Sequence, residues 1–376
     1  MKLAEFKLER YFARYEFDTP FLLSSSDIEP YTLPELLELA DPDTLALWRN
    51  LSLGYTESAG NPLLRAEIAA LYDDVSPEEV LVFSGAEEAI FSLSNVLLGP
   101  GEHAVVLQPA YQSLYEVGRA TGADVSPVRL QPEEGWQLNL GRIETALRPT
   151  TRLLVLNFPH NPTGALPTPD QLQGAVQLAR EREAHLLSDE VYRGLEYDPG
   201  DRLPAAVELY ERGVSLGVMS KAWALAGLRI GWIVTHDSDL LRRLAAFKDY
   251  TTICNSAPSE ILALIALRAA PCVLERNRAI LRENLSQVDA FFARWPNAYE
   301  WVRPRAGCIA FPRLTLPVPI EEFCSGLLQS EGVMLLPGTV YEQEGNFFRL
   351  GWGRRNLPAA LSRLHRYTER CVEAGG

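Results

Sequence analysis

From residue 64 onward, the chain alternates stretches with a helical spacing of apolar residues and short apolar runs typical of strands. The clearest strand is 152–157 (RLLVLN), a run of the kind that is buried on both faces of a parallel sheet. We expect further strands at 80–84, 103–108, 124–128, 185–188 and 214–219, and helices at 64–72, 87–97, 111–121 and 171–183. This alternation predicts an α/β fold with a mostly parallel central sheet flanked by helices.

The last third of the chain has a less regular order. We expect helices at 240–250, 259–269, 272–295, 320–330 and 358–371, and short strands at 306–314, 333–336 and 347–352. The long helix at 272–295 could carry the chain out of the first domain. We therefore predict a large domain over 45–272 and a smaller α/β domain that combines 1–44 with 273–376.

Composition narrows the function classes. The 376 residues carry 49 acidic and 35 basic side chains, and this net charge of −14 argues against nucleic acid or an anionic membrane as partner. Five cysteines, an odd number without a CxxC pair, favour a reduced compartment. The N-terminus is charged, and the most apolar stretch, 261–267, is far shorter than the roughly 20 residues that span a bilayer. We expect a cytoplasmic protein.

The basic residues include only four lysines, Lys2, Lys7, Lys221 and Lys248. Lys221 ends an apolar strand, next to Ser220 and eight residues before Arg229. Apolar surroundings disfavour the ammonium form of a lysine, and the neutral amine is a nucleophile toward an aldehyde. The other three lysines are expected to face the solvent.

Two loops after strands could bind an anion or a polar ligand. Residues 83–88 (FSGAEE) run from a strand into a helix whose free N–H groups suit a phosphate, although, taken alone, the string is more often an ordinary strand–helix turn with Ser84 as cap. Residues 157–164 (NFPHNPTG) follow the buried strand, and ligands in parallel sheets bind beyond such strand ends. The Asn161 amide is a candidate donor there, whereas we expect His160 to be structural.

A carboxylate follows the next strand, in 188–192 (SDEVY). Asp189 could ligate a metal or hold a cationic ring nitrogen. Because no His/Asp/Glu cluster at metal spacing accompanies it, the second use is favoured and no metal is predicted.

Together these parts describe a site for pyridoxal phosphate. The string SKAWALAGLRIG at 220–231 resembles the lysine signature of class I/II aminotransferases of fold type I. HNPTG at 160–164 and SDEVY at 188–192 are similar to two other diagnostic strings of that family, in the same order, and the resemblance covers roughly 50–355. Val218 departs from the family, which usually has a small hydroxyl residue or Gly there, and this removes one potential phosphate contact.

The resemblance implies roles for individual residues. Lys221 would form a Schiff base with the cofactor and move the substrate α-proton, while Asp189 would keep the pyridine nitrogen protonated. Tyr192 and Asn161 would hydrogen-bond the phenolic oxygen of the ring, and Tyr111 would stack on its face. The phosphate would be bound by Gly85, Ala86, Ser220 and Arg229.

The resemblance also implies substrates and assembly. Arg349 matches the arginine that, with Asn161, binds the α-carboxylate of an amino acid or a 2-oxo acid. Tyr55 is similar to the tyrosine that family members send to the phosphate of a partner subunit, which implies a homodimer.

Two chemistries stay open on this scaffold. The leading one is a ping-pong transfer of an amino group through Lys221, and the alternative is elimination, replacement or cyclisation, as in a C–S lyase or a cyclase. Ser24–Asp27 stands where family members often have a Gly-rich loop, and with FKLERYFARYEF at 6–17 it resembles the branch containing capreomycidine synthase. We expect that loop to face the substrate.

The substrate side chain also stays open. An acidic one would need a second cation, for which Arg14, Arg303 and Arg305 are candidates. An aromatic pocket could instead be formed by Tyr15, Tyr31 and Trp223.

Overall fold

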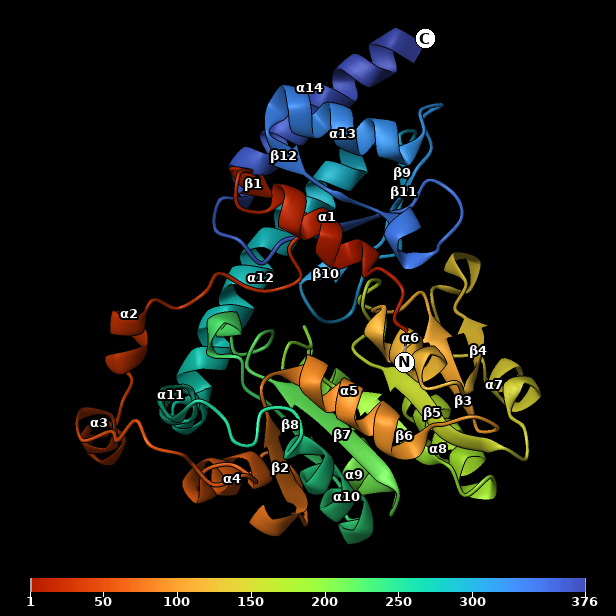
Figure 1. The fold of residues 1–376 in the computed structure, drawn as a ribbon. Helices are drawn as coiled ribbons and strands as arrows, with labels where there is room; N and C mark the ends of the chain where they lie inside the picture. Colours follow the sequence, from red (N-terminus) through yellow and green to blue (C-terminus); the bar gives the residue numbers. More distant parts are fainter. Residues whose placement is uncertain (1, 376) are drawn as a thin grey trace.

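The computed structural model describes residues 2–375, and its centre is a seven-stranded sheet in the order β2-β8-β7-β6-β5-β3-β4 (Figure 1). All neighbouring pairs are parallel except those that involve β8. This arrangement confirms the predicted α/β fold. The strands are β2 (Val80–Phe83), β3 (His103–Gln108), β4 (Asp124–Arg129), β5 (Thr151–Asn157), β6 (His185–Asp189), β7 (Gly213–Val218) and β8 (Gly231–Val234).

Strand β8 was not expected from the sequence. It has only four residues and runs antiparallel between β2 and β7. Its approach to β7 requires a glycine, because a Cβ on Gly217 would lie 2.3 Å from the Trp232 ring. The strand brings the end of β7, which precedes Lys221, next to the end of β2.

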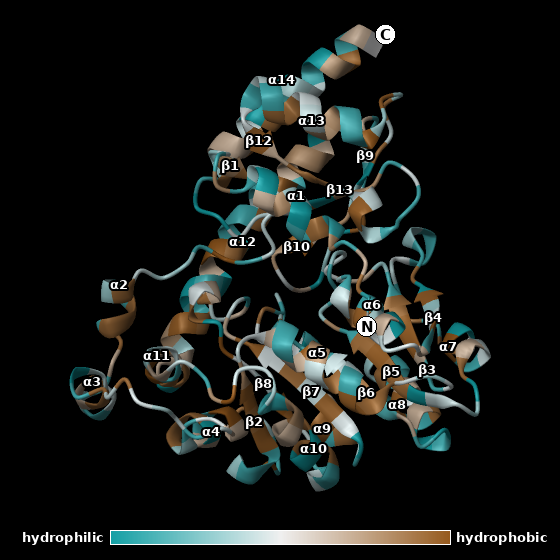
Figure 2. Cartoon of the chain, in the orientation of Figure 1, coloured by the Kyte–Doolittle hydropathy of each residue, from teal (hydrophilic) through white to brown (hydrophobic). Residues whose placement is uncertain are grey.

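Helices cover both faces of the sheet, and the strands between them are the most hydrophobic part of the chain (Figure 2). Apolar residues of α5 and α10 share one buried cluster with alternate residues of β3 and β5, and those of α7 and α8 share another with the intervening residues. These covering helices are α4 (Pro62–Ala69), α5 (Ala86–Leu97), α6 (Ser113–Ala120), α7 (Leu140–Ala146), α8 (Pro169–Glu181), α9 (Ala206–Leu209) and α10 (Ser238–Lys248).

Two consecutive helices, α11 (Ala257–Arg268) and α12 (Ala270–Arg294), lead from the sheet to the C-terminal part (Figure 1). Within residues 2–375 no single helix is long and apolar enough to cross a membrane. Taken together, α11 and α12 have the length and composition of a membrane span, but the chain bends by 80° between them. The C-terminal elements are β9 (Tyr299–Glu300), β10 (Ile309–Ala310), β11 (Arg313–Leu314), α13 (Ile320–Glu331), β12 (Val333–Met334), β13 (Leu336–Pro337), β14 (Phe348–Gly351) and α14 (Leu357–Gly375). Short 3-10 turns lie at Pro77–Glu79, Pro132–Glu134, Pro199–Asp201, Ala226–Leu228 and Gly338–Tyr341.

The expected strand at 306–314 is wrong as a single element. It is divided into β10, which pairs with β14, and β11, which pairs with β9. Pro312 lies between them and has no N–H to donate to a ladder, so the chain changes partner there.

The N-terminal segment packs on two parts of the molecule, the C-terminal elements and α11. β1 (Phe21–Leu22) pairs with β12, and α1 (Lys7–Tyr15) lies between the C-terminal elements and the sheet (Figure 1). α2 (Leu33–Leu37) and α3 (Pro42–Arg49) instead pack on α11. The division into domains at 44/45 and 272/273 stays a prediction.

The expectation that Lys248 faces the solvent is wrong. Its side chain is buried at the end of α10, where Nζ donates a 2.5 Å hydrogen bond to the Ser58 carbonyl and lies 5.9 Å from the Phe83 ring centroid. The segment before α4 covers this end of the helix, which a local pattern cannot show. Lys2 and Lys7 are exposed, as expected.

Candidate active site

A cavity of about 400 Å³ opens at the carboxyl ends of β6 and β7, beside the first turn of α5. It is covered from the other side by α1 and by residues 25–27. Eight of the predicted site residues line it: Ala86, Tyr111, Asn161, Asp189, Ser220, Lys221, Arg229 and Arg349. The structure therefore brings together most of the site that the sequence predicts.

The turn from β2 into α5 forms a cradle for an anion. Gly85 has a φ of +87°, and a Cβ there would lie 2.6 Å from Nη2 of Arg229, so only glycine leaves this space free. No side chain caps the helix, which leaves the first N–H groups of α5 available. Nη1 of Arg229 lies 3.4 Å from the Ser220 hydroxyl, and within residues 2–375 no carboxylate pairs with this guanidinium. These groups suit a phosphate.

Asp189 is a buried carboxyl at the end of β6. Its Oδ1 accepts one hydrogen bond, 3.2 Å long, from the Val191 N–H, and burial raises the pKa of Asp189 to about 7. Asn157 joins this strand end to the next loop, because its amide donates to the Asp189 carbonyl at 3.0 Å and its Oδ1 accepts from the Asn161 N–H at 2.8 Å. A cationic partner would relieve the cost of the buried carboxylate.

Lys221 lies just beyond β7, and its Nζ donates to Oγ of Ser26 at 2.9 Å. Burial and the charge of Arg349 lower the pKa of Lys221, against the opposing effect of the Asp27 and Glu9 carboxylates. The Tyr192 hydroxyl donates to the Ser26 carbonyl at 2.8 Å, so Tyr192 reaches the site through this loop and not as a lining residue. Ser25, Ser26 and Asp27 line the cavity, in line with the expected position of the Ser24–Asp27 loop.

Arg349 is the one buried residue among the three basic residues of 2–375 that line the cavity, with 1% of its surface exposed. Its Nε and Nη2 donate to the Ser24 carbonyl at 2.9 and 2.7 Å, and its Nη1 donates to the Tyr341 hydroxyl at 2.5 Å. That hydroxyl in turn donates to Oδ1 of Asn161 at 3.1 Å. No carboxylate within residues 2–375 neutralises Arg349, so the group is available for an anionic ligand.

Sequence reasoning missed the contribution of α1. Leu8, Glu9, Phe12 and Glu16 of this helix and its C-cap line the cavity, and Oε1 of Glu9 accepts a 3.0 Å hydrogen bond from the Tyr111 hydroxyl. The apolar spacing of Leu8 and Phe12 marks an amphipathic helix, which is the one signal that could have found it. Tyr341 was missed as well, and no motif marks it.

Several candidates do not reach the cavity. Tyr55 is 90% exposed and lies away from it, and the candidate cations Arg14, Arg303 and Arg305 and the candidate aromatics Tyr15, Tyr31 and Trp223 do not line it. Arg303 and Arg305 pair with Asp289 and Asp201 instead. His160 is buried, with its Nδ1 2.8 Å from the Thr163 hydroxyl, and burial lowers the pKa of this imidazole to about 3, which supports a structural role.

Comparison with known families gives this geometry a context. The family described as aminotransferase class I and II matches residues 25–364. The chain belongs to this family. Its members include pyridoxal-phosphate-dependent aminotransferases, and the matched range contains the strand ends, the anion cradle and Lys221.

Individual relatives cover nearly the whole chain. Capreomycidine synthase of Streptomyces vinaceus is 33% identical over 89% of this chain and 86% of its own length. Aspartate/prephenate aminotransferase of Thermus thermophilus is 30% identical over 83% and 82%. A crystal structure of a PLP-dependent aminotransferase from Streptococcus suis superimposes with a TM-score of 0.93 at 32% identity, over 98% and 99% of the two chains.

The family uses pyridoxal 5′-phosphate, and the residues present fit this group. The cradle around Gly85 has room and donors for a phosphate, Asp189 is a buried carboxyl without a paired cation, and Lys221 is a half-buried amine whose pKa is lowered. Among residues 2–375 no group of three or more His, Cys, Asp or Glu side chains is arranged to hold a metal ion.

Proposed function

We propose that this protein moves an amino group between an amino acid and a 2-oxo acid by a ping-pong cycle. The observation that carries the proposal is one cavity in which the half-buried amine of Lys221 lies with a buried carboxyl, Asp189, and a buried guanidinium without a carboxylate partner, Arg349. Bound pyridoxal 5′-phosphate supplies an aldehyde carbon and an electron-withdrawing ring.

The chain's own residues bind and orient both reactants. Gly85, Ala86, Ser220 and Arg229 would hold the phosphate, and Asp189 would hold a proton on the ring nitrogen. Asn161 would supply a hydrogen bond on the ring's phenolic side, and Tyr111 would lie against the ring's face. Tyr192 would join Asn161 only if its hydroxyl left the Ser26 carbonyl, to which it donates at 2.8 Å.

Arg349 binds the substrate α-carboxylate. Its fork is fixed by the Ser24 carbonyl and the Tyr341 hydroxyl, which also holds the Asn161 side chain. A guanidinium oriented by neutral groups keeps its full charge for a bidentate contact.

Lys221 supplies the amine for covalent attachment and then moves the α-proton. Burial lowers its pKa, so the neutral amine that accepts a proton is more populated than in an exposed lysine. The Ser26 hydroxyl, 2.9 Å from Nζ, orients this amine toward the cavity.

A second candidate is elimination, replacement or cyclisation with the same residues. The 33% identity to a relative named capreomycidine synthase favours this alternative, as does the contact of Ser26 with Lys221, because Ser26 belongs to the loop that departs from the common family pattern.

A half-reaction separates the two candidates. The holoenzyme is mixed with one amino acid and no 2-oxo acid, and products are quantified. Transfer releases one 2-oxo acid per site, stops, and resumes when an acceptor is added. Continuous release of ammonia or of a cyclised product would overturn the transfer proposal in favour of the alternative.

We also propose that the enzyme is a homodimer whose Tyr55 reaches the phosphate of the partner subunit. Tyr55 and Tyr250 are 90% and 91% exposed, and Leu53 and Ile253 are exposed as well. The Thr56 hydroxyl donates to the Asn255 carbonyl at 3.2 Å, so these apolar side chains come from two adjacent segments. An exposed apolar surface of this kind favours burial against another chain.

A further inference from the structure

The basic residues of the cavity are all used by the proposed function. Lys221, Arg229 and Arg349 are the cations among the lining residues that the structure describes, and they serve the cofactor aldehyde, the phosphate and the α-carboxylate. No lining cation is left for an acidic substrate side chain. The lining carboxylates are more numerous: Asp189, Glu9, Glu16, Asp27 and Glu87.

Three of these carboxylates belong to the N-terminal segment. Glu9 and Glu16 are seven residues apart on α1 and its C-cap, and Asp27 follows in the loop whose Ser26 contacts Lys221. They therefore cover the cavity from the side opposite the sheet. Glu87 is separate, because it lies in the first turn of α5 and accepts a 2.9 Å hydrogen bond from the Ser113 hydroxyl.

The carboxylates on α1 are not neutralised. Glu16 is half-buried and forms no ion pair within residues 2–375, and Glu9 accepts a hydrogen bond only from the neutral Tyr111 hydroxyl. Asp27 pairs with Arg354 at 2.9 Å. Burial, together with the like charges of Asp27 and Glu9, raises the pKa of Glu16, and the cations Arg354 and Lys221 offset this only in part.

An independent feature lies in the same loop. Ser25 lines the cavity and is 3% exposed, yet its hydroxyl has no hydrogen-bond partner among the described residues. Buried hydroxyls are almost always paired, so an unpaired one at a cavity wall is available to a ligand. Ser25 can accept an N–H from a donor bound in the cavity that Glu16 also lines.

We propose that the amino-acid substrate carries a cationic side chain, a guanidinium or an ammonium group, which Glu9 and Glu16 bind with the Ser25 hydroxyl. The inference rests on the proposed function, since Arg349 must hold the α-carboxylate at the other end. A basic side chain brings the charge that this wall lacks, and its several N–H donors match the separate acceptors.

The test compares substrates that differ in charge at nearly constant shape. The holoenzyme is titrated with L-arginine, L-lysine, L-citrulline and L-glutamate while the absorbance of the bound cofactor is followed. L-Citrulline replaces the guanidinium of arginine by a neutral ureido group. We expect arginine, lysine or both to bind about tenfold or more tightly than citrulline, and glutamate to bind most weakly.

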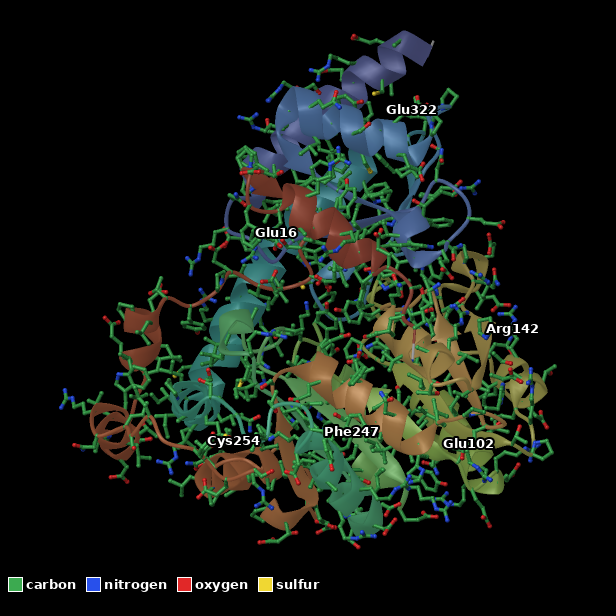
Figure 3. The ribbon with its side chains drawn as sticks, in the orientation of Figure 1. Glu16, Glu102, Arg142, Phe247, Cys254 and Glu322 are labelled. Atoms are coloured by element: carbon green, nitrogen blue, oxygen red, sulfur yellow. The ribbon has the colours of Figure 1, made fainter. Side chains whose placement is uncertain are left out.

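Variants assign the effect to residues. Glu16→Gln and Glu9→Gln should each reduce the preference for the cationic amino acid over citrulline by about fivefold or more. The matched control is Glu322→Gln, an exposed residue on α13 that lies away from Glu16 (Figure 3), and it should keep the wild-type preference. Cofactor absorbance per chain shows that each variant is folded and loaded.

The outcomes distinguish the inference from the proposed function. If citrulline or glutamate binds as tightly as arginine and lysine, or if neither α1 variant changes the preference, the inference is overturned while amino-group transfer stands. If no amino acid changes the absorbance of the loaded enzyme, the proposed function is overturned and the inference falls with it.

Discussion

Asp189 and Arg349 are buried, Lys221 is half-buried, and all three ionisable groups contact neutral partners instead of opposite charges. Their hydrogen bonds go to the Val191 N–H, the Ser26 hydroxyl, the Ser24 carbonyl and the Tyr341 hydroxyl. Burying charge without a counter-charge costs stability. A cofactor and a substrate that bring the complementary charges therefore gain affinity from relieving that cost.

The cost at Asp189 can be measured as a pH dependence. Burial raises its pKa in the folded apoenzyme from 3.8 to about 7, so the folded state holds a proton that the unfolded state has lost. The stability of the apoenzyme should consequently fall as the pH rises through this window. Relative to Asp189→Asn, which does not titrate, the free energy of unfolding of the wild type should decrease by a few kcal/mol between pH 4 and pH 8.

Urea unfolding of both apoproteins at several pH values checks this expectation. Parallel profiles for the wild type and Asp189→Asn would show that the carboxyl is not penalised by burial. Loading the cofactor should reduce the difference between pH 4 and pH 8, because a protonated ring nitrogen would stabilise the carboxylate.

Elements with strong local patterns were predicted well, and those that depend on tertiary contacts were not. β3 has the predicted bounds, 103–108, because all six of its residues are buried. β8 was missed because a four-residue strand inside a signature string carries little pattern of its own. The burial of Lys248 could not be predicted, since the covering segment lies 190 positions away in the sequence.

The segments around Tyr55 and Tyr250 carry the prediction about assembly. In sedimentation velocity the wild type should have twice the 41.9 kDa mass of one chain. Leu53→Asp combined with Tyr250→Asp should shift it toward the monomer and weaken cofactor retention, since charges would be buried in the interface. Val372→Asp, on the exposed surface of α14, is the matched control and should stay dimeric. A wild type that sediments as a single chain at micromolar concentration would contradict the proposal.

At the scale of the whole molecule, one side of the cavity could be predicted from the sequence and the opposite side could not. The side formed by the sheet comes from motifs at strand ends, so Asn161, Asp189, Ser220, Lys221 and Arg229 could be predicted to meet. The opposite side is formed where α1 and the 25–27 loop return over the sheet, and Tyr341 arrives from the C-terminal part. No local signal fixes such a return, which is why Glu9, Glu16 and Tyr341 were missed.

The central claim is that Lys221 is the residue that binds the cofactor covalently. Borohydride reduction of the holoenzyme followed by peptide mass spectrometry tests it directly, because the chain has only four lysines. The account predicts one modified peptide, with the reduced cofactor on Lys221, and none in Lys221→Ala. An adduct on Lys248, which is buried and also has a lowered pKa, or no adduct on a cofactor-loaded enzyme would contradict it.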